Sequence, residues 1–267
     1  GDFSTPGSLL GGLMCEFAKK AMDSFKTRKG FTSQFVRNAS NAEFRKMCEQ
    51  MDGPGDFHWF FSDDSLLRIA GVLFEMDISS CDISQTPGMF DLVISMFDGF
   101  PHFKDAVQRC ADQALLPLRI KDPTTRKKVL RLYALWLIEY SGTTLTTILN
   151  CFASALIGLC AHQQGADDVP SLHVAAASVG YQVTLKQCSS PPQAQFLKYS
   201  FYQAEGRYES FLNLGPILRS FGTCKGDLPG RGSHTARAFA WNSSVIRGFR
   251  DCGDNCITRM IAKHYNG

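Results

Sequence analysis

Two groups of aspartates stand where short apolar runs end, a placement suited to metal-dependent chemistry. Asp63 and Asp64 separate two strand-like runs, whereas Asp77 ends a third run and Asp82 follows it at a strand-to-helix turn. Carboxylates from the ends of neighbouring strands can hold two divalent cations about 4 Å apart, the arrangement used for in-line nucleotidyl transfer. An Asp-Asp pair is also common in ordinary turns, so this pattern alone leaves both explanations open.

A loop followed by a polar helix face forms the second pattern. Ser141 and Gly142 precede a strongly helical segment, in which Thr146 and Asn150 are four residues apart. Residues at this spacing lie on one face of a helix, whereas Ser-Gly before a helix is by itself an ordinary N-cap. The joint occurrence of this pattern and the strand-end aspartates favours a nucleotidyl-transfer site.

The charge distribution agrees with a metal site that also handles a polyanion. The chain has 267 residues, 44% of them hydrophobic, and 28 Lys and Arg against 25 Asp and Glu give a net charge of +3. Residues 51–100 carry nine acidic side chains against the single Arg68, a balance of −8. The flanks are basic, with +3 in 1–50, +4 in 101–140 and +5 in 206–267. Such flanks attract phosphates, although a solvated acidic face has the same central composition.

The ten cysteines are expected to be reduced thiols of a cytosolic protein. The chain is long for a disulfide-stapled secreted domain and opens with no signal peptide. Cys252 and Cys256 lack a neighbouring histidine in register, so a zinc site there is not favoured. The longest apolar stretch, 148–161, contains Asn150 and is too short to span a bilayer. Because the chain begins with Gly rather than Met, we expect it to be part of a longer protein.

The apolar runs predict strands and helices without regular βαβ alternation, which indicates an α+β fold. Strands are predicted at 58–61, 66–69, 72–76, 116–120 and 181–185. Helices are predicted at 8–25, 87–97, 129–138, from just after Ser141-Gly142 to about Cys160, and at 171–179. The first two strands should form a hairpin that carries Asp63 and Asp64 at its tip.

These segments resemble the palm domain of viral RNA-dependent RNA polymerases over roughly residues 55–205. Asp77 and Asp82 resemble motif A, and the segment 141–150 fits the Ser-Gly-x3-Thr-x3-Asn pattern of motif B at every defined position. The segment 177–186, a small-residue helix end followed by Gly-Tyr and a strand, resembles motif D. The segment 196–201 resembles the Phe-Leu-Lys-x-x-Phe of motif E in picornavirus-like enzymes.

Two Asp-Asp pairs compete for motif C, which must be a strand-turn-strand hairpin. Only two residues separate Asp168 from the next predicted helix, so Asp167 and Asp168 leave no room for two strands. Asp63 and Asp64 have strand-like runs on both sides. The resulting order C, A, B resembles the permuted palm of birnaviruses and permutotetraviruses, although the tip reads Ser-Asp-Asp instead of the Ala-Asp-Asn of birnaviruses.

The resemblance implies a two-metal catalytic centre. Asp63 and Asp77, with Asp64 alongside and the Ile78 carbonyl as an additional ligand, would bind two Mg²⁺ or Mn²⁺ ions. Lys186 would be the general acid that protonates pyrophosphate.

The resemblance also implies residues that bind nucleotide and RNA. The incoming ribose would be recognised by Ser141, Thr146, Asp82 and Asn150, with a hydrogen bond between the last two. Gly142 would let its loop move with the template, and Lys198 would contact the primer or the initiating nucleotide.

The implied fold is a right-hand polymerase palm, an antiparallel sheet backed by helices, with partial fingers and thumb. The implied domains are 1–54 partial fingers, 55–100 palm with motifs C and A, 101–140 fingers insertion, 141–205 palm with motifs B, D and E, and 206–267 start of the thumb. The implied activity is RNA-directed RNA polymerisation, in which ribonucleoside monophosphates are transferred to an RNA 3′-hydroxyl. The implied partners are template and primer or product RNA, ribonucleoside triphosphates and other viral replication proteins, in the host cell cytoplasm.

Two other functions are compatible with a palm. A catalytically silent palm-like protein could bind RNA or act as a scaffold, but the strand-end aspartates and the complete motif B pattern argue against it. A reverse transcriptase would typically carry a bulky residue in place of Asp82. Binding of divalent ions would separate the silent protein from the enzyme.

Overall fold

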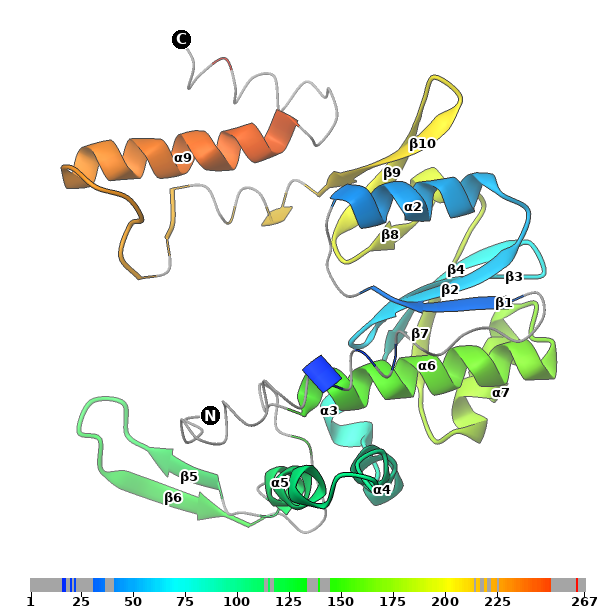
Figure 1. The fold of residues 1–267 in the computed structure, drawn as a ribbon, viewed down its shortest axis with the longest axis horizontal. Helices are drawn as coiled ribbons and strands as arrows, with labels where there is room; N and C mark the ends of the chain where they lie inside the picture. The colour runs from blue at the N-terminus through cyan, green and yellow to red at the C-terminus, as the bar shows by residue number, and fades with distance from the viewer. Residues whose placement is uncertain are drawn as a thin grey trace. The chain divides into compact units, whose positions relative to one another are not determined.

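The computed structural model (Figure 1) describes residues 16, 17, 20, 22, 31–36, 41–112, 115, 118–133, 139, 145–213, 215, 216, 219, 222–224, 226–250 and 263. The chain forms two compact units. Unit 1 comprises residues 1–37 and 55–187, and unit 2 comprises residues 38–54 and 188–267. The predicted fingers segment 1–54 is therefore divided between the two units.

Unit 1 contains a five-stranded sheet in the order β1-β2-β3-β4-β7. Its strands are β1 Phe31–Phe35, β2 Asp56–Phe61, β3 Asp64–Ile69, β4 Val72–Ile78 and β7 Val183–Cys188. The strands β2, β3 and β4 form an antiparallel meander, as their three consecutive apolar runs predicted, and β1 pairs with β2 in parallel. In β2 four consecutive residues, 57–60, are buried, which is typical of a strand covered on both faces.

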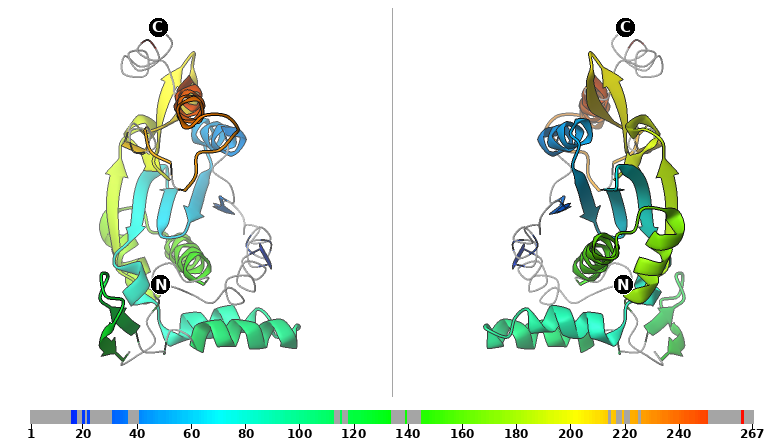
Figure 2. Two further views of the ribbon diagram at one scale, coloured as in Figure 1. Left: turned by 90° about the vertical axis from the view of Figure 1, so that its left-hand side faces the viewer. Right: turned by 90° about the vertical axis from the view of Figure 1, so that its right-hand side faces the viewer.

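The helices of unit 1 are α3 Cys81–Ser84, α4 Pro87–Ser95, α5 Pro101–Asp112, α6 Thr146–Gln164 and α7 Val169–Ser178. Helix α6 packs against β1, β2 and β3 and also contacts α4 and α7 (Figures 1 and 2). It ends at Gly165, which adopts φ of 65°, a left-handed conformation that glycine takes without strain. The helices predicted at 87–97 and 171–179 are confirmed as α4 and α7.

The predicted helix over 129–138 is wrong where the structure describes it. Residues Lys128–Leu132 form strand β6, which pairs with β5, Leu118–Lys121, as an antiparallel two-stranded ribbon. The sequence Lys-Val-Leu-Arg-Leu alternates polar and apolar residues over most of its length, and this period of two fits a strand. Of the predicted helix 8–25, only four residues, 16, 17, 20 and 22, are described, and all are helical.

Unit 2 contains helix α2, Asn41–Asp52, and an antiparallel sheet in the order β10-β9-β8. The strands are β8 Gln195–Phe196, β9 Tyr199–Ala204 and β10 Arg207–Leu212. Helix α2 packs on β10, and the rings of Phe44 and Tyr199 stack with centroids 3.9 Å apart. The long helix α9, His234–Arg250, follows near the end of the described chain.

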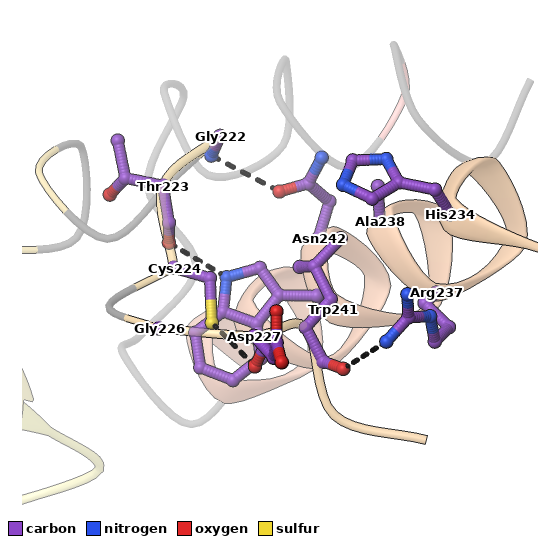
Figure 3. Close-up of a pocket in the computed structure, with 11 residues that line it drawn as sticks. Gly222, Thr223, Cys224, Gly226, Asp227, His234, Arg237, Ala238, Trp241 and Asn242 are labelled. Atoms are coloured by element: carbon purple, nitrogen blue, oxygen red, sulfur yellow. Dashed lines mark hydrogen bonds between the residues drawn. The ribbon is translucent and has the colours of Figure 1, made fainter. Parts of the chain in front are cut away.

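A pocket of about 260 Å³ lies at the beginning of α9 (Figure 3). The Trp241 indole donates to the Thr223 carbonyl at 2.9 Å, and the Gly222 amide donates to Asn242 Oδ1 at 3.1 Å. Arg237 donates to the Leu228 carbonyl at 2.8 Å. These bonds hold the loop 222–230 against the helix, and none of the predicted site residues lines the pocket.

Candidate functional site

The hairpin of β2 and β3 presents the first aspartates of the site. Phe61 pairs with Asp64, so the turn consists of Ser62 and Asp63 alone. Ser62 adopts φ of 56°, the left-handed conformation that tight hairpin turns require. The prediction that both carboxylates lie at the tip is therefore wrong for Asp64, which is the first residue of β3. The loop has two residues and not the four that the sequence indicated, so the β2–β3 ladder extends to the pair Phe61–Asp64.

Asp64 faces Asp77 directly across the β3–β4 ladder. Residues that face each other in an antiparallel pair have side chains on the same face of the sheet, about 5 Å apart at Cβ. Burial, and then the charge of Asp63, raises the pKa of the Asp77 carboxyl. The structure thus brings Asp63, Asp64 and Asp77 to one end of the sheet, where like charges repel one another.

These carboxylates supply the oxygen ligands that Mg²⁺ and Mn²⁺ prefer. Ile78 ends β4 with its side chain in the core, so the carbonyl is the group it could offer. Within the described residues, no three His, Cys, Asp or Glu side chains converge closely enough to form a ready metal site. The oxygen donors suit a divalent cation, but the three carboxylates would have to move closer together to bind one.

A chain of buried and partly buried hydrogen bonds connects the hairpin turn to α6. The Asn150 amide donates to the Ser62 hydroxyl at 3.3 Å and accepts from Gln85 at 2.9 Å. The Tyr181 hydroxyl donates to Gln85 Oε1 at 3.0 Å. The Ser154 hydroxyl donates to the Ser62 carbonyl at 2.7 Å. These bonds fix the turn that carries Asp63 and join four segments that are distant in the sequence.

This network corrects the predicted hydrogen bond between Asn150 and Asp82. Both ends of the Asn150 amide are engaged, by Gln85 and by Ser62. The four-residue spacing placed Asn150 on the correct helix face, but it could not identify its partners. The sequence analysis missed Gln85 and Tyr181, whereas Ser154 continues the spacing of the polar stripe and could have been found.

We predict that Gln85→Leu lowers the free energy of unfolding by about 1–3 kcal/mol. The change leaves the Asn150 carbonyl and the Tyr181 hydroxyl buried without their partner, and an unsatisfied buried group costs about this much. Urea unfolding measures the difference. Gln163→Leu, at an exposed position of α6, is the matched control and should change stability by less than about 0.5 kcal/mol. Equal losses in the two variants would contradict the role of the network.

Glu139 is a buried carboxylate that the sequence analysis did not single out. Its exposed fraction is 3%, and neither carboxylate oxygen has a hydrogen bond of standard geometry among the described residues. Burial raises the pKa of Glu139 to about 8; the Thr146 hydroxyl offsets part of this, and the charges of Asp82 and Asp63 add to it. Its only sequence signal is a single acid that follows an apolar run just before Ser141.

The raised pKa of Glu139 makes stability depend on pH. The unfolded chain loses this proton near pH 4.5 and the folded chain near pH 8, so the contribution of Glu139 to stability falls between these values. We predict that Glu139→Gln gains stability relative to the parent protein as the pH rises from 5 to 9, by on the order of 2–4 kcal/mol. Thermal unfolding across this range measures it, with the exposed Glu205→Gln as control. A pH-independent difference would contradict the assignment.

Lys186 lies in β7 and pairs with β4, the strand that carries Asp77. Its ammonium forms an ion pair with Glu75 at 2.9 Å. Glu75 and Asp77 are two residues apart in β4, so they lie on the same face of the sheet. The structure thus connects Lys186 to the strand that carries Asp77, with Glu75 as its partner.

The remaining predicted residues fall in other places. Lys198 is exposed in the turn between β8 and β9 of unit 2, with φ of 66°. Thr146 begins α6, and the half-buried Asp82 lies in α3. Ser141 and Gly142 lie outside the described residues.

Asp167 and Asp168, the alternative pair for motif C, stand at the start of a helix. The Asp168 carboxylate accepts the Ser171 amide at 2.8 Å and is the N-cap of α7, with Ser171 completing a capping box. No strand in the described part of unit 1 includes either residue. Their placement agrees with the expectation that they cap a loop before the next helix.

No helix among the described residues is both long and apolar enough to cross a membrane. No protein-family model and no curated protein matches the sequence.

Several solved structures share the fold, including two structures of viral proteins. One is the X-ray structure of the birnavirus VP1–VP3 complex, with a TM-score of 0.61, and the other is the RNA polymerase VP1 from Infectious Pancreatic Necrosis Virus, with a TM-score of 0.62. In both comparisons the identity is 13%, and the alignment covers 96% of this chain and 40% of the other. The chain thus spans less than half of either one. Over that part, it has the α+β fold of a birnavirus RNA polymerase.

Proposed function

We propose that this chain is the catalytic core of a viral RNA-dependent RNA polymerase with the motif order C, A, B. The observation that carries the proposal is the arrangement of Asp63, Asp64 and Asp77 at one end of an antiparallel sheet. The shared fold with birnavirus polymerases supports it. The use of Asp168 as a helix cap supports the choice of Asp63 and Asp64 for motif C.

Asp63, Asp64, Asp77 and the Ile78 carbonyl would hold two Mg²⁺ or Mn²⁺ ions. When bound, such ions would lower the pKa of the primer 3′-hydroxyl and offset the charge of the leaving pyrophosphate. Burial, and then the charge of Asp63, raises the pKa of Asp77, so a cation held between these carboxylates would relieve their repulsion. The hydrogen bonds of Ser62 to Asn150 and Ser154 would keep the turn that carries Asp63 in place.

Other residues would bind and protonate the substrate. Lys186 would donate a proton to pyrophosphate after leaving its ion pair with Glu75. Asp82, Ser141 and Thr146 would bind the ribose, with Asn150 acting as a positioning residue through Gln85 and Ser62.

The wider assignments follow from the same proposal. Gly142 and Lys198 would contact RNA. The palm would comprise 55–100 and 141–205, with fingers in 1–54 and 101–140 and the start of the thumb in 206–267. Template and primer RNA, ribonucleoside triphosphates and other viral replication proteins would be the partners, in a replication complex of the host cytoplasm.

The test is Mg²⁺-dependent incorporation of a labelled ribonucleotide on a primed RNA template. Incorporation that follows the template and stops on chelation of the metal supports the polymerase. Titration with Mn²⁺ in the same preparation tests the alternative, a catalytically silent palm-like protein. Stoichiometric ion binding without incorporation would indicate a metal site without polymerase activity. If the protein shows no ion binding and no incorporation, the scaffold function is favoured.

A further inference from the structure

The β5–β6 ribbon carries the densest positive charge of the described chain segments. Residues 118–132 include one acid, Asp122, and six basic residues, Arg119, Lys121, Arg126, Lys127, Lys128 and Arg131. The balance is 6 − 1 = +5 within 15 residues. No residue of this ribbon belongs to the catalytic site proposed above.

The register of the ribbon pairs like charges. Arg119 faces Arg131 and Lys121 faces Lys128 across the ladder. Directly opposed like charges destabilise an antiparallel pair. Alternation along each strand, with the irregularity between Ile120 and Lys121, places these four positions on one face. A ribbon whose register sets basic positions opposite one another is suited to bind a polyanion.

In the part of the chain that the structure describes, no ion pair neutralises the exposed basic groups of the ribbon. The side chains of Lys121, Arg126, Lys127 and Arg131 are exposed, and within the described residues none of them forms an ion pair. The Asp122 carboxylate is used locally, because it accepts the amides of Thr124 and Thr125 at 2.8 and 2.7 Å.

An aromatic ring stands beside the basic face. Tyr133 is 66% exposed, and the Arg131 guanidinium lies 5.1 Å from its ring centroid. Exposed aromatic rings interleaved with basic groups bind single-stranded nucleic acid, because bases stack on the rings while phosphates contact the cations.

We propose that this face of the β5–β6 ribbon binds single-stranded RNA through its phosphates, with Tyr133 stacking on a base. The choice of RNA over other polyanions rests on the proposed polymerase function. An anionic bilayer suits the ribbon less well, because the exposed apolar residues Ile120, Leu130 and Leu132 lie on the opposite face from Arg131. A flat bilayer surface contacts one face of the ribbon at a time, so it could not bind the apolar and the basic side chains together.

The test measures binding of a fluorescent 20-nucleotide oligouridylate by anisotropy, without metal or nucleotide, at several KCl concentrations. The test variant is Arg126→Gln with Arg131→Gln. The matched control is Lys104→Gln with Arg109→Gln, because these α5 residues are exposed and already paired with Asp98 and Asp105. Both double variants remove two positive charges, and circular dichroism verifies that each is folded.

The test variant should bind RNA about tenfold more weakly near 0.1 M salt. The salt slope, which is the steepness of the fall of log K with log [KCl], should decrease in magnitude by about 1.4, because each of the two lost phosphate contacts contributes about 0.7 for a single strand. The control should bind within about twofold of the parent protein. Tyr133→Ala should lower the affinity by about tenfold without changing the salt slope.

An unchanged slope in the test variant, or equal losses in test and control, would overturn the proposal. A test variant that keeps its RNA affinity but no longer binds phosphatidylserine vesicles would assign the ribbon to a membrane and also overturn it. The outcome is separate from polymerase activity. Ribbon-dependent RNA binding without nucleotide incorporation would leave this proposal standing while the proposed function fails.

Discussion

Asp77→Asn should reduce ribonucleotide incorporation by at least about 10³-fold, because metal binding contributes several kcal/mol to the transition state of nucleotidyl transfer. The substitution keeps the size of the side chain and removes its charge. RNA affinity should stay within about twofold, since RNA is bound mostly through phosphate contacts with basic residues. Stability should not fall, because burial and the charge of Asp63 already disfavour the ionised carboxylate.

The matched control for this variant is Asp167→Asn with Asp168→Asn. Asparagine is as good an N-cap as aspartate, so the start of α7 should persist and activity should change by less than about twofold. Single-nucleotide incorporation under initial-rate conditions measures both variants. Near-normal incorporation by the Asp77 variant, or loss of activity in the control alone, would transfer the catalytic role to the other aspartate pair.

Gly158→Ala should lower the free energy of unfolding by about 3 kcal/mol or more. A Cβ at this position of α6 would overlap the His58 ring, with Cγ at 2.9 Å and other ring atoms closer still. His58 cannot move away easily. It is fully buried in β2, and its two ring nitrogens form hydrogen bonds of 3.2 Å with the Ser33 and Ser65 hydroxyls. Overpacking a rigid site costs about 1–3 kcal/mol, and breaking these bonds adds to it.

Chemical denaturation measures this loss, and two further variants interpret it. Gly88→Ala changes a helical glycine of α4 whose nearest neighbour would be Thr86 Oγ1 at 3.8 Å, so its effect should be neutral or stabilising. Combining Gly158→Ala with His58→Ala removes the ring and should cost less than the sum of the single losses. Additive losses would show that the helix and the ring do not compete for space.

The side of α6 that packs against the sheet can be predicted from the sequence. Thr146 and Asn150 begin a stripe at four-residue spacing that continues through Ser154, Gly158 and His162. In the structure Asn150 and Ser154 bond to Ser62, Gly158 lies against His58, and the His162 ring stacks on Phe31 at 4.4 Å. Non-aliphatic residues on one face of an otherwise apolar helix thus mark the side that packs against β1, β2 and the hairpin turn.

Outside the meander, the runs 116–120 and 181–185 predicted β5 and β7, but three other strands were harder to predict. Residues 129–138 were predicted as a helix because most of them are apolar, although part of β6 alternates polar and apolar residues. β10 was missed, although the Glu205-Gly206 turn precedes it, because its sequence does not alternate cleanly: Tyr208 and the three consecutive residues 210–212 are its less exposed positions. β1 was missed because its parallel pairing with β2 depends on a partner 25 residues away in the sequence. Local patterns identify elements, whereas long-range pairing depends on the packing of the whole unit.

The polar interior of the site could not be predicted from local patterns. Gln85 and Tyr181 are ordinary residues in their own segments, and only tertiary packing brings them within hydrogen-bond distance of each other and of Asn150. No neighbouring residue in the sequence indicates that Glu139 is buried. The aspartates were predictable because strand ends at one edge of a sheet are brought together by the meander itself.

Diffraction from crystals of this protein soaked in Mn²⁺, with data collected at the manganese absorption edge, tests the central claim most directly. We predict an anomalous peak about 2.1 Å from carboxylate oxygens of both Asp63 and Asp77, the distance expected for small divalent cations. The same peak should be missing from crystals of the Asp77→Asn variant. A peak beside Asp167 and Asp168, with none at Asp77, would contradict the proposed metal site and the permuted order of motifs.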